Sequence, residues 1–265
     1  DGASDIRRRV LRHVSDAFVE DPVRVLRLAR LYARLHEFTV APETLALARQ
    51  MVEHGEVDHL VAERVWQELS RGLMEAHPRR MFELLREVGA LARLLPEVDR
   101  LWGVPQRPEH HPEVDTGEHL MLVLQQCAAA DAPLAVRWAC LAHDLGKGTT
   151  PRDQWPRHLG HEGRSVKLAR ALAERLRVPG DCRELAEVVA RDHGHVHASG
   201  TLGAAATLRL LDRCDALRRP ERFELVLAAC ACDARGRTGR QADPYPQAGR
   251  LRTALRAALG IDAAA

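Results

Sequence analysis

Apolar residues recur along this chain with the spacing of an α-helix, and this periodicity limits the fold more than any other feature. The run from Pro22 to about Phe38 shows the spacing i, i+3, i+4, i+7 on one face, at Val25, Leu28, Ala29 and Tyr32. No segment sustains the strict alternation of apolar and polar residues that a half-buried strand requires. The sequence therefore predicts an all-α fold.

Helices of this kind are predicted on both sides of a proline-rich stretch. Before it they cover residues 41–53, 61–74, 78–85 and 89–94. After it, one helix begins near Thr116 and others cover residues 136–145, 161–176, 181–191, 204–217, 220–234 and 249–259. The stretch itself, residues 102–117, contains Pro105, Pro108 and Pro112 and favours a linker. We predict four parts: a helical neck and body at 1–104, a linker at 105–118, a second helical domain at 119–235 and a tail at 236–265.

Composition narrows the class of protein. Hydrophobic residues make up 46% and charged residues 29%, as in ordinary soluble proteins, and 4% aromatic residues argue against a sheet on which bases stack. The six cysteines lie in apolar stretches without a CxxC pair, which indicates reduced thiols in a cytoplasmic protein. No apolar run reaches the roughly 20 residues that span a bilayer. The chain begins with Asp1 and not with an initiator Met, and its first segment starts partway through a sequence pattern. We therefore also expect a fragment of a longer protein.

Histidine and carboxylate side chains at several predicted helix ends indicate metal chemistry. The clearest signal is the pair His143-Asp144, which lies where an apolar helix ends before Gly146. Other candidates lie near the start or end of predicted helices, at His119, His161 and His193. Asp215 lies on a later predicted helix. Imidazole and carboxylate groups are the ligands that Zn, Ni, Co, Mn or Fe sites use when water must remain exchangeable. The pattern predicts a metal-dependent hydrolase.

The order of these residues resembles the HD-domain phosphohydrolase superfamily, whose metal ligands occur as His, then His-Asp, then a distal Asp. The resemblance implies that one divalent ion is bound by His119, His143, Asp144 and Asp215, and that the additional histidines of some members are His161 and His193. Asp212 lies three residues before Asp215 on the same predicted helical face, so both are candidates for the last ligand. Lys147 matches a lysine that often follows the pair and can contact a substrate phosphate, and Arg164 is a second phosphate-binding candidate.

The chemistry follows from such ligands. A divalent metal lowers the pKa of a water molecule that it binds from 15.7 toward about 7 and neutralises phosphate oxygens as charge develops on them. Asp144 would bind the metal and orient the attacking water, and Lys147 would orient the ester, so these two are the predicted catalytic residues. The resemblance favours Ni or Mg, whereas the ligand types also suit Co, Mn, Zn or Fe.

A basic helix near the N-terminus is the second informative segment. Its arginines at 24, 27, 30 and 34 gather on the stripe opposite the apolar face, which indicates either a solvated surface or a phosphate-binding edge. The run that begins Glu20-Asp21-Pro22 resembles the EDPxRxLRxxR motif of bacterial tRNA nucleotidyltransferases, the CCA-adding enzymes. This resemblance implies that Asp21 and Arg24 read the base of an incoming CTP or ATP and that Arg27 makes a further nucleotide contact.

Five other runs resemble the same family, at residues 41–45, 63–66, 111–117, 155–158 and 233–239. The match extends from residue 1 to about 246 and implies the multifunctional form, which carries an HD domain. The full-length enzyme is then expected to bind the tRNA acceptor arm, to add CCA from CTP and ATP, and to hydrolyse 2′,3′-cyclic, 2′- and other phosphoesters. The glycine-rich loop and paired carboxylates of that family's catalytic head are not found, so we expect no nucleotidyl transfer by this chain alone.

Three interpretations follow from the sequence. The preferred one is the neck, body and tail of a CCA-adding enzyme with a working HD phosphohydrolase site. The second is a tRNA- and nucleotide-binding module whose HD site is inactive, and the third is a stand-alone HD nucleotide phosphohydrolase. The arrangement of Asp21, Arg24 and Arg27 argues against the third. The number of metal ions and the oligomeric state are left open by the pattern.

Overall fold

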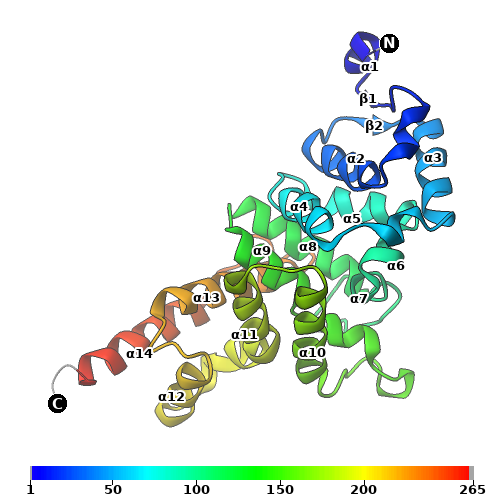
Figure 1. Ribbon diagram of the computed structural model, residues 1–265. Helices are drawn as coiled ribbons and strands as arrows, with labels where there is room; N and C mark the ends of the chain where they lie inside the picture. The colour runs from blue at the N-terminus through cyan, green and yellow to red at the C-terminus, as the bar shows by residue number, and fades with distance from the viewer. Residues whose placement is uncertain (1, 263–265) are drawn as a thin grey trace.

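The structure, a computed structural model, describes residues 2–262, and its regular structure is almost entirely helical (Figure 1). This confirms the predicted all-α fold. The only paired strands among the described residues are β1 (Val10–Leu11) and β2 (Thr39–Val40), which run parallel. Among these residues, no helix combines the length and the apolar character needed to cross a membrane.

The N-terminal part is built on α2, which packs against two later helices. Its elements are α1 (Gly2–Arg8), η1 (Asp16–Glu20), α2 (Val23–Arg34), α3 (Pro42–Glu53), η2 (Glu56–His59), α4 (Ala62–Leu73), α5 (Pro78–Glu87), α6 (Ala90–Leu94) and α7 (Pro96–Asp99). The predicted apolar face of α2 is buried at Val25, Leu28 and Ala29, where it contacts α4 and α5. The helix ends at Arg34, four residues before the predicted Phe38.

The C-terminal part surrounds α11, which packs against α9, α10 and α13. Its elements are α8 (Thr116–Ala129), α9 (Leu134–Ala142), η3 (Leu145–Thr149), η4 (Arg152–Gln154), α10 (His161–Arg175), α11 (Gly180–His197), η5 (Ala198–Thr201), α12 (Ala204–Arg213), α13 (Pro220–Arg235) and α14 (Pro246–Asp262). Helix α14 projects from one end of the molecule, opposite α1 (Figure 1). One continuous set of buried apolar side chains runs through both parts, because α5 packs on α8 and α4 packs on α9.

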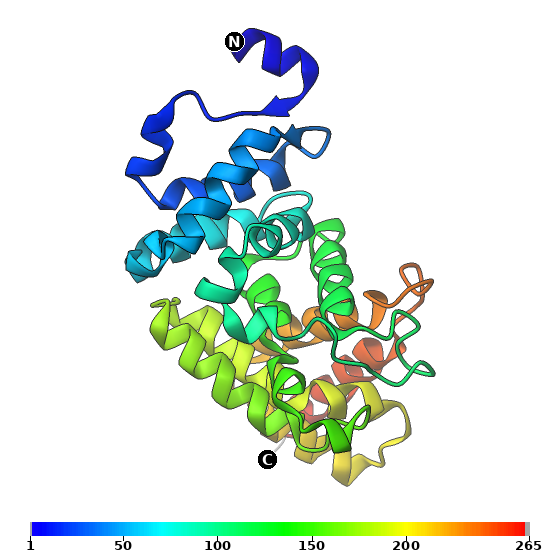
Figure 2. The ribbon, with the colours of Figure 1, turned by 90° about the vertical axis from the view of Figure 1, so that its right-hand side faces the viewer.

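The proline-rich stretch between α7 and α8 is a folded loop. Pro105 pairs with Asp115 in an isolated bridge, and the main-chain N–H of Gln106 donates to Val114 at 2.7 Å. The hydroxyl of Thr116 donates to the carbonyl of Val104 at 2.8 Å, which closes the base of the loop. In Figure 2 this loop lies beside the segment that precedes α14. These contacts give residues 105–115 a defined conformation next to the C-terminal helices.

Two further helix ends differ from the prediction at residues that were expected to bind metal. Helix α11 continues through Gly194 to His197, so His193 lies inside a helix. A glycine costs about 1 kcal/mol inside a helix, a cost that packing against neighbouring helices can outweigh. Helix α12 ends at Arg213, and Asp215 follows in a turn with φ of 53°, a left-handed conformation that aspartate adopts more readily than most residues. Asp215 therefore does not lie on a helix.

Candidate metal centre

Five helices bring histidine and aspartate side chains into one buried cluster. It contains His119 from α8, His143 and Asp144 from the end of α9, His161 from the start of α10, His193 from α11 and Asp233 from α13. His143 Nε2 lies 3.2 Å from Asp144 Oδ2 and 3.6 Å from Asp233 Oδ1. The side chains of these three residues are at most 6% exposed, so the cluster is shielded from bulk water. Sequence positions more than 100 residues apart thus meet in one place.

The cluster contains overlapping sets of ligand atoms. Three such sets lie within 4.8 Å internally: His119 with His143 and Asp144, His143 with His193 and Asp233, and Asp144 with His161 and His193. Asp144 offers Oδ2 to His143, and its Oδ1 lies 3.3 Å from His161 Nε2 and 3.6 Å from His193 Nε2. Because the carboxylate of Asp144 belongs to two sets, the geometry can accommodate one ion or two neighbouring ions.

Main-chain carbonyls fix the orientation of three imidazoles. His143 Nδ1 hydrogen-bonds to the carbonyl of Cys140 at 2.7 Å, and His193 Nδ1 to that of Val189 at 3.0 Å. His161 Nδ1 makes the same kind of bond to His158 at 2.9 Å. A carbonyl oxygen only accepts, so each Nδ1 carries the proton and each Nε2 points into the cluster. This is the arrangement by which proteins present histidines to metals.

The fourth histidine, His119, is held by carboxylates. Its Nε2 lies 2.9 Å from Asp233 Oδ1, and its Nδ1 lies 2.8 Å from Glu113 Oε1. Glu113 also approaches His111 Nδ1 at 3.2 Å and accepts the main-chain N–H of Thr238 at 3.1 Å. Burial opposes its ionisation, but these contacts with His111 and His119 hold the pKa of Glu113 well below its usual range. Glu113 therefore connects the 105–115 loop, His119 and the segment before α14.

The electrostatics of the cluster favour a cation at its centre. Burial opposes the charged imidazolium, yet the carboxylates of Asp144 and Asp233 outweigh it and raise the pKa of His143 to about 10. His193, farther from the carboxylates, responds to burial instead, which lowers its pKa to about 3. His143 Nε2 and Asp144 Oδ1 are buried without a hydrogen-bond partner among the described residues. Buried polar atoms without partners are rare, and these two are both metal-ligand types, so the donor set fits a divalent ion.

Gly146 allows η3 to pack closely against α10 beside the cluster. A Cβ at this position would collide with the carbonyl of His161 and come within 2.6 Å of the main-chain nitrogen of Ser165. The N–H of Gly146 instead donates to the Ser165 hydroxyl at 2.9 Å. The turn after Asp144 therefore packs directly on the first turn of α10, and this contact sets the spacing between Asp144 and His161.

The two residues predicted to contact phosphate, Lys147 and Arg164, have different surroundings in the structure. Lys147 lies in the cluster wall, with Nζ 2.7 Å from Asp144 Oδ2 and 2.5 Å from Gln106 Oε1. Arg164 instead donates to the carbonyls of Gly146 and Leu159 and to the Thr150 hydroxyl, at 3.2, 2.8 and 2.7 Å. Its guanidinium stabilises the loop, and phosphate binding by Arg164 stays a prediction.

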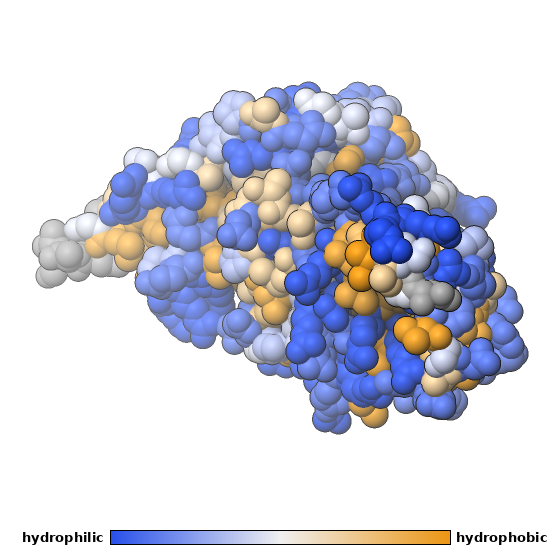
Figure 3. Space-filling view, turned by 90° about the horizontal axis from the view of Figure 1, so that it is seen from above, coloured by the Kyte–Doolittle hydropathy of each residue, from blue (hydrophilic) through white to orange (hydrophobic). Residues whose placement is uncertain are grey.

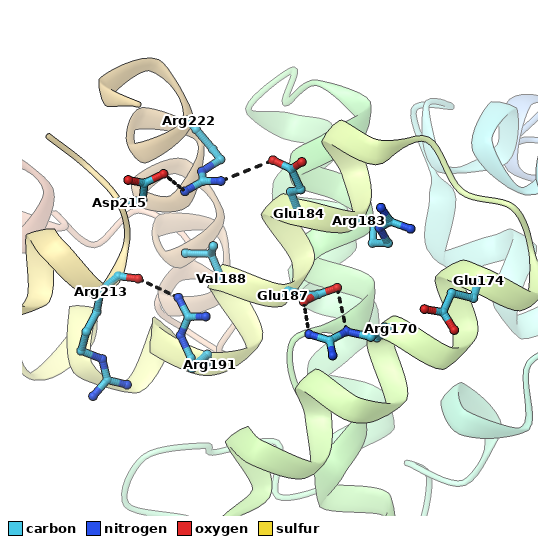
Figure 4. Close-up of a pocket in the computed structure, with 10 residues that line it drawn as sticks. All are labelled: Arg170, Glu174, Arg183, Glu184, Glu187, Val188, Arg191, Arg213, Asp215 and Arg222. Atoms are coloured by element: carbon cyan, nitrogen blue, oxygen red, sulfur yellow. Dashed lines mark hydrogen bonds and ion pairs between the residues drawn. The ribbon is translucent and has the colours of Figure 1, made fainter. Parts of the chain in front are cut away.

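The structure does not bring Asp215 to the cluster. Its carboxylate forms ion pairs at 3.2 Å with Arg218 and Arg222 and faces an open, charged pocket of about 610 Å³. Figure 4 shows this pocket, where Asp215 and Glu184 both approach Arg222. Asp212, the alternative, is exposed. In the structure Asp233, and not Asp215, lies in the cluster beside His143 and His193.

Asp233 and two residues around it, His197 and Tyr245, were not predicted from the sequence. His197 Nε2 lies 2.6 Å from Asp233 Oδ2, and His197 Nδ1 bonds to the Tyr245 hydroxyl at 2.8 Å. The available signal was the run 233–239, which resembled a known family but received no chemical role. His158, which lies near the cluster, is structural, because its ring nitrogens bond to the Thr150 hydroxyl and the carbonyl of Pro105.

The predicted nucleotide-binding residues lie far from the cluster, around the start of α2. Arg24 and Arg27 line a pocket of about 300 Å³ together with apolar side chains such as Phe18. Arg24 also donates to the carbonyl of Ala17, and Arg27 lies 3.5 Å from the buried Glu68. Asp21 pairs with Arg64 at 2.7 Å, and the hydrogen bond from Arg64 lowers its pKa. Asp21 does not line this pocket.

The surface at this end of the molecule is mostly hydrophilic, with apolar side chains exposed between the charges (Figure 3). Ile6 and Val14 are among them, with exposed fractions of 68% and 101%. Val14 also lines the pocket that contains Arg24 and Arg27. The structure therefore places the arginines next to an apolar surface as well as next to solvent.

Two family models match separate parts of the chain. The model of the HD domain matches residues 116–222, and that of the probable RNA and SrmB-binding site of polymerase A matches residues 37–101. The multifunctional CCA protein of Verminephrobacter eiseniae is 67% identical over 264 residues, which cover 100% of this chain and 64% of that protein. The chain is homologous to the multifunctional CCA proteins over its whole length. The corresponding protein of Leptothrix cholodnii is also 67% identical, over 100% of this chain and 63% of its own length.

The chain thus spans just under two thirds of the length of these CCA proteins, 64% and 63% respectively. Among solved structures, a tRNA nucleotidyltransferase complexed with a primer tRNA and an incoming ATP analogue is similar, with a TM-score of 0.54 and 17% identity. The match covers 98% of this chain and 65% of the other. At this identity the likeness establishes the shared fold.

Proposed function

We propose that the cluster binds one or two divalent metal ions and that this site hydrolyses phosphoesters. The observation that carries the proposal is the shared orientation of His143, His161 and His193, each of which turns Nε2 toward the carboxylates. An HD domain match over residues 116–222 supports the same assignment. The donor types suit Ni, Co, Mn, Zn or Fe, and the resemblance to HD phosphohydrolases favours Ni or Mg.

Two groups of residues would hold the ions. The first comprises His119, His143, Asp144 and Asp233, and the second adds His161 and His193 to the other oxygen of Asp144. When bound, the metal supplies Lewis acidity toward water and phosphate. Asp144 would also orient the attacking water, because the pKa of its buried carboxyl is held well below the usual range by Lys147 and His143 against the effect of burial.

Lys147 would bind the substrate phosphate. An ammonium group carries three N–H donors, and Asp144 and Gln106 account for two of them. The third donor and the positive charge are then available to a phosphate oxygen. In the reaction, water adds to phosphorus, the bond from phosphorus to the leaving ester oxygen breaks, and the proton lost by water ends on that oxygen. The low exposure of Lys147, 7%, keeps competing water away from this contact.

We further propose that the chain acts within a CCA-adding protein, which binds the tRNA acceptor arm and uses CTP and ATP. The supporting observations are the identity of 67% to a multifunctional CCA protein and the match to an RNA-binding region over residues 37–101. Asp21, Arg24 and Arg27 would then contact the nucleotide, and residues 1–104 would form the nucleotide- and tRNA-binding module. Residues 119–235 would form the phosphohydrolase domain.

The test is hydrolysis of 2′,3′-cyclic AMP by metal-stripped protein after addition of Ni, Co, Mn or Mg. We expect turnover that requires metal and is absent in His143→Ala, while the helical circular dichroism of the variant is retained. Arg24→Ala is the matched control, because it should weaken nucleotide binding and leave this hydrolysis intact. Absence of turnover with every metal would contradict the proposed hydrolase and favour a binding module with an inactive HD site.

A further inference from the structure

A pocket of about 350 Å³ opens beside the cluster, and its lining changes in character from the buried to the exposed side. Gln106, Lys147 and His161 line its inner part and are buried or half-buried. Its outer residues, Arg107, His110 and Arg157, are exposed. The pocket thus leads from a rim with two guanidinium groups to the predicted metal ligand His161.

One wall of the pocket presents a hydrogen-bond donor that has no acceptor. Gln106 is 2% exposed, and its Nε2 has no partner among the described residues. The orientation of the amide is determined by Lys147, because an ammonium only donates and therefore requires Oε1 on its side, at 2.5 Å. The NH₂ group must then lie on the other side. A buried donor without a partner is costly, so this position favours a ligand with acceptor oxygens.

The backbone around Gln106 is fixed before any ligand arrives. The main-chain N–H of Gln106 donates to Val114 at 2.7 Å, and the carbonyl of Pro105 bonds to His158 Nε2 at 2.8 Å. His158 is in turn held by the Thr150 hydroxyl, which also accepts from Arg164 at 2.7 Å. Arg164 therefore supports this wall through Thr150 and His158. A donor held in this way loses little conformational freedom when it binds.

The two arginines at the rim have no carboxylate partner. Neither Arg107 nor Arg157 forms an ion pair within the part of the chain that the structure describes, whereas Arg222 in the pocket of Figure 4 pairs with Asp215 and Glu184. Two uncompensated guanidinium groups beside a phosphate position attract a second anion. Guanidinium groups bind phosphate oxygens through planar pairs of donors, so this second anion fits a phosphate.

We infer that this pocket recognises a phosphoester that carries a second phosphate group, as the phosphorylated end of an oligonucleotide does. Gln106 and Lys147 hold the ester phosphate, and Arg107 and Arg157 hold the phosphodiester of the preceding nucleotide. The inference rests on the proposed phosphohydrolase, because it assigns the substrate class of that site. A nucleoside monophosphate has no second phosphate that Arg107 and Arg157 could bind, so the inference distinguishes this site from one that is specific for free mononucleotides.

The test compares two probes by calorimetric titration of metal-free protein and of protein loaded with metal. The probes are adenosine 2′-monophosphate and adenylyl-adenosine 2′-monophosphate, which has the same end and one additional phosphodiester. We expect the second probe to bind about tenfold more tightly at low salt, a preference that added salt reduces. Equal binding of the two probes by both forms of the protein would overturn the inference.

Three variants sharpen the test. Arg107→Ala with Arg157→Ala should remove the preference and leave the affinity for the mononucleotide unchanged. Gln106→Glu retains an acceptor for Lys147 and replaces the amide donor by a negative charge. It should therefore lower the affinity for both probes. Arg183→Ala, which removes an exposed arginine from the pocket of Figure 4, is the control and should change neither. An equal loss of preference in the control would also overturn the inference.

These binding measurements require no turnover, so they fail independently of the proposed hydrolase. A preference for the dinucleotide in a protein that hydrolyses nothing would contradict the hydrolase and retain the phosphate-binding pocket. Conversely, metal-dependent hydrolysis without any preference would retain the hydrolase and overturn the assignment of Arg107 and Arg157.

Discussion

Two clusters of polar side chains in the C-terminal part each contain an aspartate, one among histidines and the other among arginines, and only the first suits a metal ion. Around Asp233 the side chains are buried, and main-chain carbonyls hold the imidazoles so that Nε2 atoms converge. Around Asp215 the side chains are at the surface, and the carboxylates of Asp215 and Glu184 are paired with arginines, among them Arg222. The metal-ligand atoms His143 Nε2 and Asp144 Oδ1 lack a hydrogen-bond partner among the described residues, whereas the carboxylate of Asp215 is paired with arginines, so only the first arrangement indicates a cation site.

The strongest test of this contrast replaces one carboxylate in each cluster by its amide. Asp233→Asn should lower the affinity for divalent metal by roughly 100-fold or more, because it removes a charge that faces both His119 and His143. Asp215→Asn should leave the affinity unchanged, since its partners are arginines. Calorimetric titration of both metal-stripped variants with Ni or Mn provides the measurement. A loss of affinity in Asp215→Asn would show that the two clusters are not separate.

The close approach of η3 and α10 can be tested with two glycines of the same region. Gly146→Ala should lower the free energy of unfolding by about 1–3 kcal/mol, because the new methyl group meets the backbone of His161 and Ser165. Gly163→Ala in α10 has nothing within 4 Å of the new Cβ and should stabilise the protein by about 0.5–1 kcal/mol. Urea denaturation of both variants measures the difference. Equal effects would contradict the assigned role of Gly146.

Glu113 offers a test of how the 105–115 loop supports the cluster. Glu113→Gln keeps the shape of the side chain and removes the charge that lies 2.8 Å from His119 Nδ1. Residues that orient metal-binding histidines typically change metal affinity by about 10–100-fold, and we expect the lower end because Asp233 also holds His119. The same calorimetric titration checks this. Unchanged affinity would mean that Asp233 alone orients His119.

The smallest effect is expected at the surface cluster. Arg218→Ala removes an ion pair to Asp215 in which the arginine side chain is 79% exposed. Exposed pairs of this kind contribute about 0–1 kcal/mol, and Arg222 remains beside the carboxylate. Thermal denaturation should therefore show almost no shift relative to the unsubstituted protein. A large shift would require the surface cluster to be a structural unit of the fold.

The helical class and most elements followed from periodicity, because a buried helix face repeats locally in the sequence. His119, His143, Asp144, His161 and His193 were also found from the sequence and meet in space. Their family pattern supplied the expectation that a distal aspartate completes the set, but not which one. Asp215 and Asp233 each lie between apolar residues in the sequence, so the pattern does not distinguish them. In the structure α12 ends at Arg213, and Asp215 therefore lies in a turn outside the cluster.

Contacts between distant segments could not be predicted from the sequence. Glu113 meets Thr238, and His197 meets Tyr245, through packing of a loop and a tail against the helices. Such pairings depend on tertiary packing, which no local period encodes. The same holds for Arg164, whose spacing suits a phosphate contact although its donors serve the loop. Asp233 also lies beyond residue 222, where the HD match ends.

The most direct test of the central claim is anomalous diffraction from crystals of the protein grown with Ni or Mn. The account predicts an anomalous peak among the side chains of His119, His143, Asp144 and Asp233, with a second position beside His161 and His193 if two ions bind. A metal bound at Asp215, or no peak at the histidine cluster, would contradict it.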